Sequence, residues 1–298
     1  MLYKQLGKSS LHISQVSFGC MSLEEDQQNA TRLLHKAIEY GINFFDTADL
    51  YQKGLNEEMV GKALKEKRND VLIATKVGNQ WKADGSGWDW NPGKKYILAQ
   101  VEKSLQRLQT DHIDLYQLHG GTIDDPTDDT IDAFEHLVKQ GKIRYYGISS
   151  IRPNVIREYT KRSNIVSVMM QYSLLDRRPE EECLQLLQQN NIGVLARGSL
   201  AKGLLAGKPA TDYLNYNKAE VTKAAEAVNS ISGGNRNASQ SAIRFVLHHP
   251  AVTSAVAGIR TEKQLNEAAI ATDTTPLSEN EYKALINSIT ANTYDSHR

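Results

Sequence analysis

The chain has 298 residues, and its 35 lysine and arginine residues balance its 35 aspartate and glutamate residues. This balance provides no overall field that would attract nucleic acid or an acidic membrane surface, so we expect neither as a partner. Only two cysteines are present, Cys20 and Cys183, which excludes a disulfide framework and favours a reducing compartment. No apolar run approaches the roughly 20 residues that span a bilayer, and the first residues lack the apolar core of a signal peptide. We therefore expect a cytoplasmic protein.

The predicted elements begin with a small hairpin, residues 2–4 against 11–14. Strand-like runs then alternate with segments of helical periodicity. The strands are predicted at residues 16–18, 43–45, 71–75, 113–118, 143–148, 166–170, 193–196 and 253–257. The helices are predicted at residues 26–40, 56–67, 94–108, 127–140, 154–161, 179–189, 238–248 and 262–271, with Asn56 as the cap of the second.

Three insertions interrupt this alternation. Residues 78–93 form a glycine-rich loop that holds all three tryptophans, Trp81, Trp88 and Trp90. Residues 198–217 form a long connection after the seventh strand, and residues 276–290 contain an extra helix with a cap at Ser278. The tryptophans either pack their loop onto the protein or line a substrate pocket, and the sequence favours neither.

Strands that alternate with helices indicate a parallel sheet, because parallel neighbours need a crossover connection. Eight such units are the number that closes a (β/α)8 TIM barrel. A doubly wound sheet would open with a glycine-rich phosphate turn, and the turn after the first strand has no G-x-G-x-x-G pattern. We therefore predict a single barrel domain over residues 1–298, with an N-terminal hairpin and extra helices.

In such barrels the reactive site lies at the carboxyl ends of the strands. Asp46, Lys76 and His119 end the second, third and fourth strands, and Tyr51 lies in the loop after Asp46. Ser149, Ser150, Gln171, Tyr172 and Arg197 end later strands. A nearby Asp46 would keep Lys76 charged, which disfavours a Schiff-base enzyme and favours a cation that stabilises the phenolate of Tyr51. A metal-dependent barrel hydrolase would need more His, Asp or Glu side chains at this rim.

The chain resembles the aldo-keto reductase superfamily over nearly its whole length. The segments that carry the resemblance are FFDTADLY at 44–51, IATKVG at 73–78, DLYQLHG at 114–120, GISS at 147–150, QYSLLDR at 171–177 and GIRTEKQLNEA at 258–268. It is most similar to the bacterial branch that includes general stress reductases and proteins like potassium-channel β subunits.

The resemblance implies an enzyme that reduces an aldehyde or ketone to an alcohol with NADPH. The family's catalytic tetrad falls on Asp46, Tyr51, Lys76 and His119. Tyr51 would donate the proton, and Lys76 held by Asp46 would make that proton easier to release. His119 would orient the carbonyl group or assist the proton transfer. An alternative from the same resemblance is a nucleotide-sensing module like the channel β subunits, with little turnover.

The resemblance also assigns the cofactor contacts. The carboxamide would meet Ser149 and Gln171, and the nicotinamide ribose would lie near Gly19, Cys20 and Met21. The pyrophosphate would meet Gly198, Ser199, Leu200 and the loop 203–208, which includes Gly203, Leu204 and Lys208. The 2′-phosphate and adenosine end would meet Arg260, Gln264 and Glu267, and Arg197 and Gly258 complete the predicted contacts. An arginine near a helix N-terminus suits a phosphate dianion, so Arg260 favours NADPH over NADH.

Three positions depart from the family pattern. Ser150 stands where the family usually has asparagine, Arg197 stands where many members have an aromatic residue, and Ala268 replaces a common asparagine. These departures affect individual cofactor contacts and leave the tetrad unchanged. The physiological substrate and the oligomeric state do not follow from the sequence.

Overall fold

The computed structural model describes all 298 residues, and its centre is a closed barrel of parallel strands. The eight strands are β3 (Val16–Gly19), β4 (Phe44–Asp46), β5 (Leu72–Val77), β8 (Ile113–Leu118), β9 (Ile143–Ser149), β10 (Ser167–Gln171), β11 (Gly193–Arg197) and β12 (Val252–Gly258). Each strand pairs in parallel with its neighbours, and β12 closes the barrel by pairing with β3. The predicted (β/α)8 TIM barrel is confirmed.

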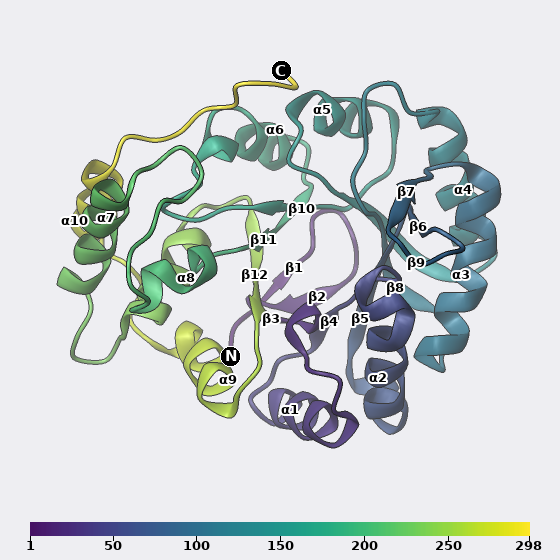
Figure 1. Ribbon diagram of the computed structural model, residues 1–298, viewed down its shortest axis with the longest axis horizontal. Helices are drawn as coiled ribbons and strands as arrows, with labels where there is room; N and C mark the ends of the chain where they lie inside the picture. Colours follow the sequence, from purple (N-terminus) through teal and green to yellow (C-terminus); the bar gives the residue numbers. More distant parts are fainter.

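Helices surround the barrel (Figure 1). They are α1 (Gln27–Glu39), α2 (Leu55–Leu64), α3 (Lys94–Leu108), α4 (Thr127–Lys139), α5 (Pro153–Arg162), α6 (Cys183–Gln189), α7 (Lys218–Ser230), α8 (Ala238–His248), α9 (Glu262–Ala269) and α10 (Glu279–Ser288). Short 3-10 segments lie at Cys20–Ser22, Tyr51–Gly54, Lys65–Asp70, Arg178–Glu180, Ala201–Ala206 and Ile270–Asp273. No helix combines the length and the apolar character needed to cross a membrane.

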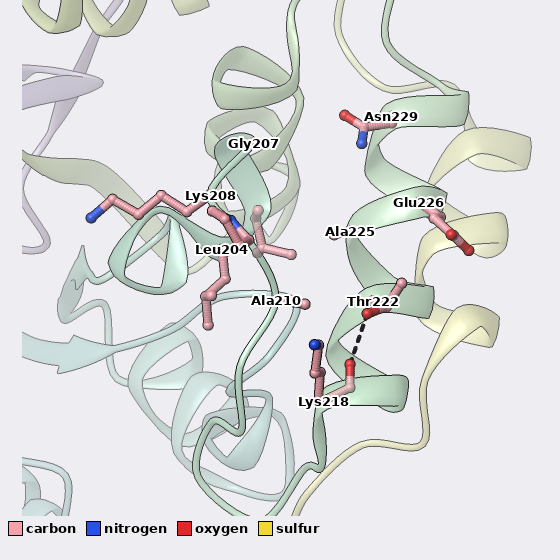
Figure 2. Close-up of a pocket in the computed structure, with 11 residues that line it drawn as sticks. Leu204, Gly207, Lys208, Ala210, Lys218, Thr222, Ala225, Glu226 and Asn229 are labelled. Carbon is pink, nitrogen blue, oxygen red and sulfur yellow. Dashed lines mark hydrogen bonds between the residues drawn. The ribbon is translucent and has the colours of Figure 1, made fainter.

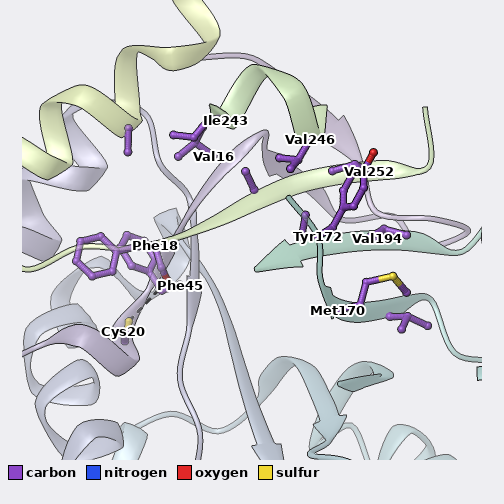
Figure 3. Close-up of a cluster of buried hydrophobic side chains, with 14 of the residues drawn as sticks. Val16, Phe18, Cys20, Phe45, Met170, Tyr172, Val194, Ile243, Val246 and Val252 are labelled. Carbon is purple, nitrogen blue, oxygen red and sulfur yellow. Dashed lines mark hydrogen bonds between the residues drawn. The ribbon is translucent and has the colours of Figure 1, made fainter. Parts of the chain in front are cut away.

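The larger apolar core lies between the barrel and its helices (Figure 3). In β3, for example, Val16 and Phe18 point outward into this core, and the Phe18 ring stacks on Phe45 of β4 at 6.0 Å between centroids. The intervening Ser17 hydrogen-bonds Ser254 of β12. This alternation follows from the period of two in a strand and gives the barrel separate inner and outer faces.

The N-terminal hairpin, β1 (Tyr3–Gln5) and β2 (His12–Ser14), closes one end of the barrel. Its side chains Leu6, Leu11 and Ile13 are buried in a smaller apolar cluster with inward-facing strand residues, which include Phe44 and Leu115. Gly7 lies against the start of β11, because a Cβ atom there would be 2.7 Å from the Gly193 nitrogen. The hairpin therefore fills the amino end of the barrel, and the carboxyl end is left for the site.

Three elements differ from the sequence-based prediction. The helix predicted at 179–189 begins only at Cys183, after the 3-10 segment at Arg178–Glu180. Residues 78–93 contain a second hairpin, β6 (Asn79–Trp81) paired with β7 (Trp88–Trp90), where we expected only a loop. Helix α7 was not predicted, although Asn217 and Glu220 form a capping box at its start. The predicted cap at Ser278 of α10 is confirmed by a capping box with Glu281.

Candidate active site

Lys76 is the centre of the candidate site. It belongs to β5, whose Ala74 lies opposite Asp46 in the parallel pair with β4, so both side chains emerge at the carboxyl end of the barrel. Its Nζ atom donates to Asp46 Oδ2 at 2.7 Å, to the Thr47 carbonyl at 2.7 Å and to the Tyr51 hydroxyl at 3.3 Å. An ammonium group has three donors, and all three are used here. The sequence-predicted trio of Asp46, Tyr51 and Lys76 is therefore one hydrogen-bonded group.

Lys76 is held in its charged form although its side chain is only 1% exposed. Burial lowers the pKa of Lys76, but the charges and hydrogen bonds of Asp46 and Tyr51 outweigh burial and raise it above its ordinary value. A lysine with a raised pKa is a poor Schiff-base nucleophile. The geometry therefore supports a cation that acts on its hydrogen-bond partners.

Gln117 also contacts this group, and the sequence analysis did not include it. This fully buried residue of β8 donates from Nε2 to Asp46 Oδ1 at 3.3 Å. It lies two residues before His119, which directly follows the last residue of β8. That period-two spacing is the only sequence signal that could have identified it.

The loop that carries Tyr51 has an unusual backbone. The next three residues, Gln52, Lys53 and Gly54, all have positive φ values, at 51°, 56° and 94°. Only glycine adopts this region without cost, so the conformation must be held by its surroundings. Gln52 contributes by donating from Nε2 to the Leu23 carbonyl at 3.1 Å.

Asn56 also holds this loop, and the prediction that it caps the second helix is wrong. Gly54 occupies the cap position of α2, and Asn56 is fully buried. Its Nδ2 atom donates to the Cys20 carbonyl at 2.9 Å and to Gln52 Oε1 at 3.1 Å, while its Oδ1 atom accepts from Thr47 at 2.7 Å. Asn56 therefore ties the Tyr51 loop to the end of β3.

His119 lies beside Tyr51, with ring centroids 5.8 Å apart and the rings edge to face. Burial, followed by the charges of Lys76 and Arg197, lowers the pKa of His119 to about 3. The imidazole is thus neutral at physiological pH. Its Nδ1 atom is buried without a hydrogen-bond partner.

Residues predicted to contact a nicotinamide end the next strands around the barrel. Gln171 of β10 lies opposite Arg197 of β11, and its side-chain amide accepts from Arg197 at 3.2 Å and donates to the Tyr213 hydroxyl at 3.0 Å. Ser149 ends β9. The hydroxyl of Ser150 accepts from the Arg152 backbone in its own loop. Tyr213 was not predicted, because it comes from the connection after β11, whose path does not follow from the sequence.

The segment from Gly198 to Lys208 forms a tight turn after β11. Ala201, Lys202 and Gly203 have consecutive positive φ values, and the buried Ser199 hydroxyl has no hydrogen-bond partner. Leu204 and Lys208 border a groove of about 290 Å³ between this segment and α7, but the Lys208 ammonium group extends away from α7 (Figure 2). The segment predicted to bind the pyrophosphate therefore has an unusual backbone and a buried hydroxyl without a hydrogen-bond partner.

The other predicted cofactor residues lie at two places on the rim. Gly19 pairs with Gly258 where β3 meets β12, and next to Gly19 the Cys20 thiol is fully buried while Met21 is 66% exposed. Their strand ends place these residues on the same side of the barrel as Asp46.

The second place is the start of α9. Arg260 immediately precedes the Thr261 cap, and its backbone N–H donates to Gln264 Oε1 at 2.9 Å. Glu267, one turn later, accepts from Ser239 of α8 at 3.2 Å. The Arg260 side chain is exposed beside the positive end of a helix.

The tryptophans mainly pack their hairpin onto the protein. The Trp90 indole donates to Asp125 at 2.8 Å, and its ring lies so close to Gly78 that a Cβ atom there would be 2.7 Å away. The Trp81 indole donates to the Leu50 carbonyl of the Tyr51 loop at 3.2 Å. Trp88 is 52% exposed and touches Trp81 edge to face.

A metal-dependent hydrolase would need a different site. Nowhere in the chain do three or more His, Cys, Asp or Glu side chains come together in an arrangement that could hold a metal ion. The polar groups at the barrel mouth are instead a lysine, a phenol, a neutral imidazole and one carboxylate.

Comparison with known proteins places this chain in a family. Residues 15–289 match the model of the aldo/keto reductase family. The chain is 49% identical over 307 residues to the uncharacterized oxidoreductase YqkF of Bacillus subtilis, with 100% of both chains covered. It is 30% identical over 307 residues to a probable voltage-gated potassium channel subunit beta of Arabidopsis thaliana, with 93% of both chains covered.

A solved structure shows the same similarity. Aldo-keto reductase AKR11C1 from Bacillus halodurans, in its holo form, superposes with a TM-score of 0.94 at 50% identity and covers 100% of this chain and 99% of its own. Its apo form gives a TM-score of 0.86 with the same coverage. The family match, the full-length relatives and the shared barrel together show that this chain belongs to the aldo/keto reductase family and is an oxidoreductase.

Proposed function

We propose that the protein reduces aldehydes or ketones to alcohols with NADPH, and that Tyr51 is the proton donor. The observation that carries the proposal is the saturated Lys76 ammonium group, which gives two of its hydrogen bonds to Asp46 and Thr47 and the third to Tyr51. A cation fixed in this way stabilises the phenolate that forms when Tyr51 releases its proton.

Each tetrad residue has a distinct role in this proposal. Tyr51 donates its hydroxyl proton to the carbonyl oxygen, and Lys76 stabilises the charge left on Tyr51. Asp46 keeps Lys76 charged and in place. His119 is neutral and orients the carbonyl oxygen by a hydrogen bond, since its lowered pKa leaves no imidazolium proton to give near neutral pH.

The residues of the rim fit a nicotinamide nucleotide, which when bound supplies the hydride. The unpartnered Ser199 hydroxyl is available to a phosphate oxygen, and the Gln171 amide is already oriented by Tyr213 and Arg197. Arg260 at the start of α9 supplies a guanidinium group for hydrogen bonds to a 2′-phosphate. These features support NADPH as the preferred form of the cofactor.

One experiment tests both the reaction and the cofactor. The purified protein is assayed by the loss of nicotinamide absorbance with NADPH or NADH and an activated aromatic aldehyde such as nitrobenzaldehyde. We expect turnover with a preference for NADPH. In Arg260→Ala this preference falls by about tenfold or more, because a charge-assisted contact to the 2′-phosphate is lost, and in Arg260→Lys it falls less.

Two results would count against the proposal. An unchanged cofactor preference in Arg260→Ala would exclude the assigned phosphate contact. Tight binding of NADPH without oxidation across a panel of aldehydes and ketones would favour the nucleotide-sensing alternative.

A further inference from the structure

Gln117 lies in the barrel wall beside the Asp46–Lys76 pair. In the parallel pair of β5 and β8 it is directly opposite Lys76, and on its other side it is opposite Gly147 of β9. Beyond Gly147 the next residue in register is Ser167 of β10. Gln117 and Ser167 are fully buried, and Lys76 is the only charged residue among these four paired positions.

The side-chain amide of Gln117 is satisfied at one end only. Its Nε2 atom donates to Asp46 Oδ1 at 3.3 Å, while its Oε1 atom is buried without a hydrogen-bond partner. The reverse orientation of the amide would place Oε1 against the carboxylate, so the donor must face Asp46. A buried amide oxygen without a partner costs free energy, which an apolar side chain of similar size would avoid. The hydrogen bond to Asp46 is the one interaction that such a side chain could not make.

Asp46 depends on this donor, because each of its two oxygens has one side-chain donor. Oδ2 accepts from Lys76 at 2.7 Å, and Oδ1 accepts from Gln117. Burial raises the pKa of Asp46, and this rise is opposed first by the charge and hydrogen bond of Lys76, then by the hydrogen bond of Gln117 and the charge of Arg197. Without the Gln117 donor the carboxylate would be easier to protonate, and a protonated Asp46 no longer fixes the Lys76 ammonium group by its charge.

We propose that Gln117 is a positioning residue for the reduction: its Nε2 donor stabilises the Asp46 carboxylate against Lys76, which in turn holds Lys76 at the Tyr51 hydroxyl. This proposal rests on the proposed function of the tetrad. Gln117 makes no hydrogen bond to Tyr51 or Lys76, so it acts through Asp46.

Other titratable or charged groups also surround the Asp46–Lys76 pair. They are Tyr51, His119, Arg197 and Cys20. Variants at Gln117 leave all of them in place. Their contributions to the pH dependence therefore cancel when a variant is compared with the wild type at the same pH.

The first test is urea unfolding without cofactor between about pH 4 and pH 8, comparing the wild type with Gln117→Met, which has a similar size and no donor. Because the folded-state pKa of Asp46 is raised, its contribution to stability decreases as the pH rises from the unfolded-state pKa through the folded-state pKa. In Gln117→Met this decrease should continue to a pH about one unit higher, since a hydrogen bond to a charged group contributes at this level. The variant should therefore lose stability relative to the wild type as the pH rises.

The second test is the acid side of the pH profile of single-turnover NADPH oxidation with excess aldehyde. In Gln117→Met, the pH at which the rate has fallen by half should lie about one unit higher than in the wild type, because Asp46 takes up a proton sooner as the pH falls. The affinity for NADPH at neutral pH should be unchanged.

Two further variants separate the donor from packing. Gln117→Leu removes the same donor with an apolar side chain of another shape, and it should give the same two shifts as Gln117→Met. Ser167→Ala is the matched control, because the Ser167 hydroxyl is buried in the same barrel wall and has no hydrogen-bond partner. Both pH dependences of this variant should be those of the wild type. A packing role would change the free energy of unfolding by the same amount at every pH.

The proposal is overturned if the difference in stability between the wild type and Gln117→Met is the same at every pH, since Gln117 would then act by packing alone. It is also overturned if that difference depends on pH but the acid side of the rate profile does not move in an active enzyme. A wild type without turnover would contradict the proposed function alone, because the unfolding comparison still decides whether Gln117 stabilises the carboxylate.

Discussion

At the scale of single residues, the site depends on a buried charge that has only one carboxylate partner. Lys76 meets Asp46 at 2.7 Å, and both side chains are almost completely buried. When one member of such a pair is removed, the other remains as an uncompensated charge in a low-dielectric environment. Stability and the proposed catalysis therefore depend on the same contact.

We predict that Asp46→Asn lowers the free energy of unfolding by about 3–5 kcal/mol, because it leaves the Lys76 ammonium group without a counter-charge. The double variant Asp46→Asn with Lys76→Met is the control, and it should recover much of this loss but remain inactive. Urea unfolding together with the aldehyde assay measures both effects. If Asp46→Asn were as stable as the wild type, the Asp46 carboxylate would not be needed to compensate the buried charge of Lys76.

His119 provides a prediction for pH. Its folded-state pKa of about 3 lies below the ordinary value of 6.5, so between these values the unfolded chain binds a proton that the folded chain does not. Above pH 6.5 the imidazole is neutral in both states, and its burial does not reduce the free energy of unfolding. As the pH falls from 6.5 toward 3, only the unfolded chain gains the proton, so the free energy of unfolding decreases. Linkage gives a loss of about 2 kcal/mol between pH 7 and pH 5.

The matched comparison is His119→Gln, which keeps a polar side chain but has no titrating group. Urea unfolding at the two pH values should show a steeper loss of stability in the wild type than in this variant, and all other titrating groups cancel in the difference. Equal losses in the two proteins would mean that burial of the imidazole does not shift its protonation.

The positions of Asp46, Lys76 and His119 could be predicted because each lies at the end of a recognisable apolar strand, and the barrel topology brings strand ends together. Gln117 and Tyr213 could not. Gln117 lies inside a strand that reads as continuous and buried, and Tyr213 reaches Gln171 from 42 positions away through an irregular connection. The Tyr213 contact depends on the path of a loop, which the local pattern does not determine.

At the scale of elements, the periodicity of strands and helices predicted most of the barrel, and the errors have physical causes. Helix α7 was missed because its buried face is short and small, with only Val221, Ala224 and Val228, and the other alanines blur that helical spacing. The β6–β7 hairpin was missed because its glycine-rich sequence is typical of a loop. Its structure depends on anchoring by tryptophans.

We predict that Trp90→Ala loosens this hairpin, because the variant loses the Asp125 hydrogen bond and the packing on Gly78 and Gly120. Amide hydrogen exchange in β6 and β7 should become at least tenfold faster. Trp88→Ala is the matched control. Because Trp88 is largely exposed, its removal should leave the amide protection of β6 and β7 unchanged. Equal exchange rates in Trp90→Ala and the wild type would show that another contact anchors the hairpin.

At the scale of the whole molecule, the two ends of the barrel have different tasks. The N-terminal hairpin fills the amino end with Leu6, Leu11 and Ile13, and the carboxyl end carries every residue proposed for chemistry. Eight strand–helix units in the sequence were sufficient to predict closure. The sequence could not predict the shape of the carboxyl-end loops, and under the proposed function these loops decide which substrate enters.

The central claim is that Tyr51 gives the proton to the carbonyl oxygen, aided by Lys76. It is tested most directly by the single-turnover rate of NADPH oxidation with excess aldehyde, compared between the wild type and Tyr51→Phe. We predict that the rate falls by about 10²–10⁴-fold, because a positioned proton donor contributes at this level, while the affinity for NADPH is unchanged. A wild-type rate in Tyr51→Phe would contradict the claim.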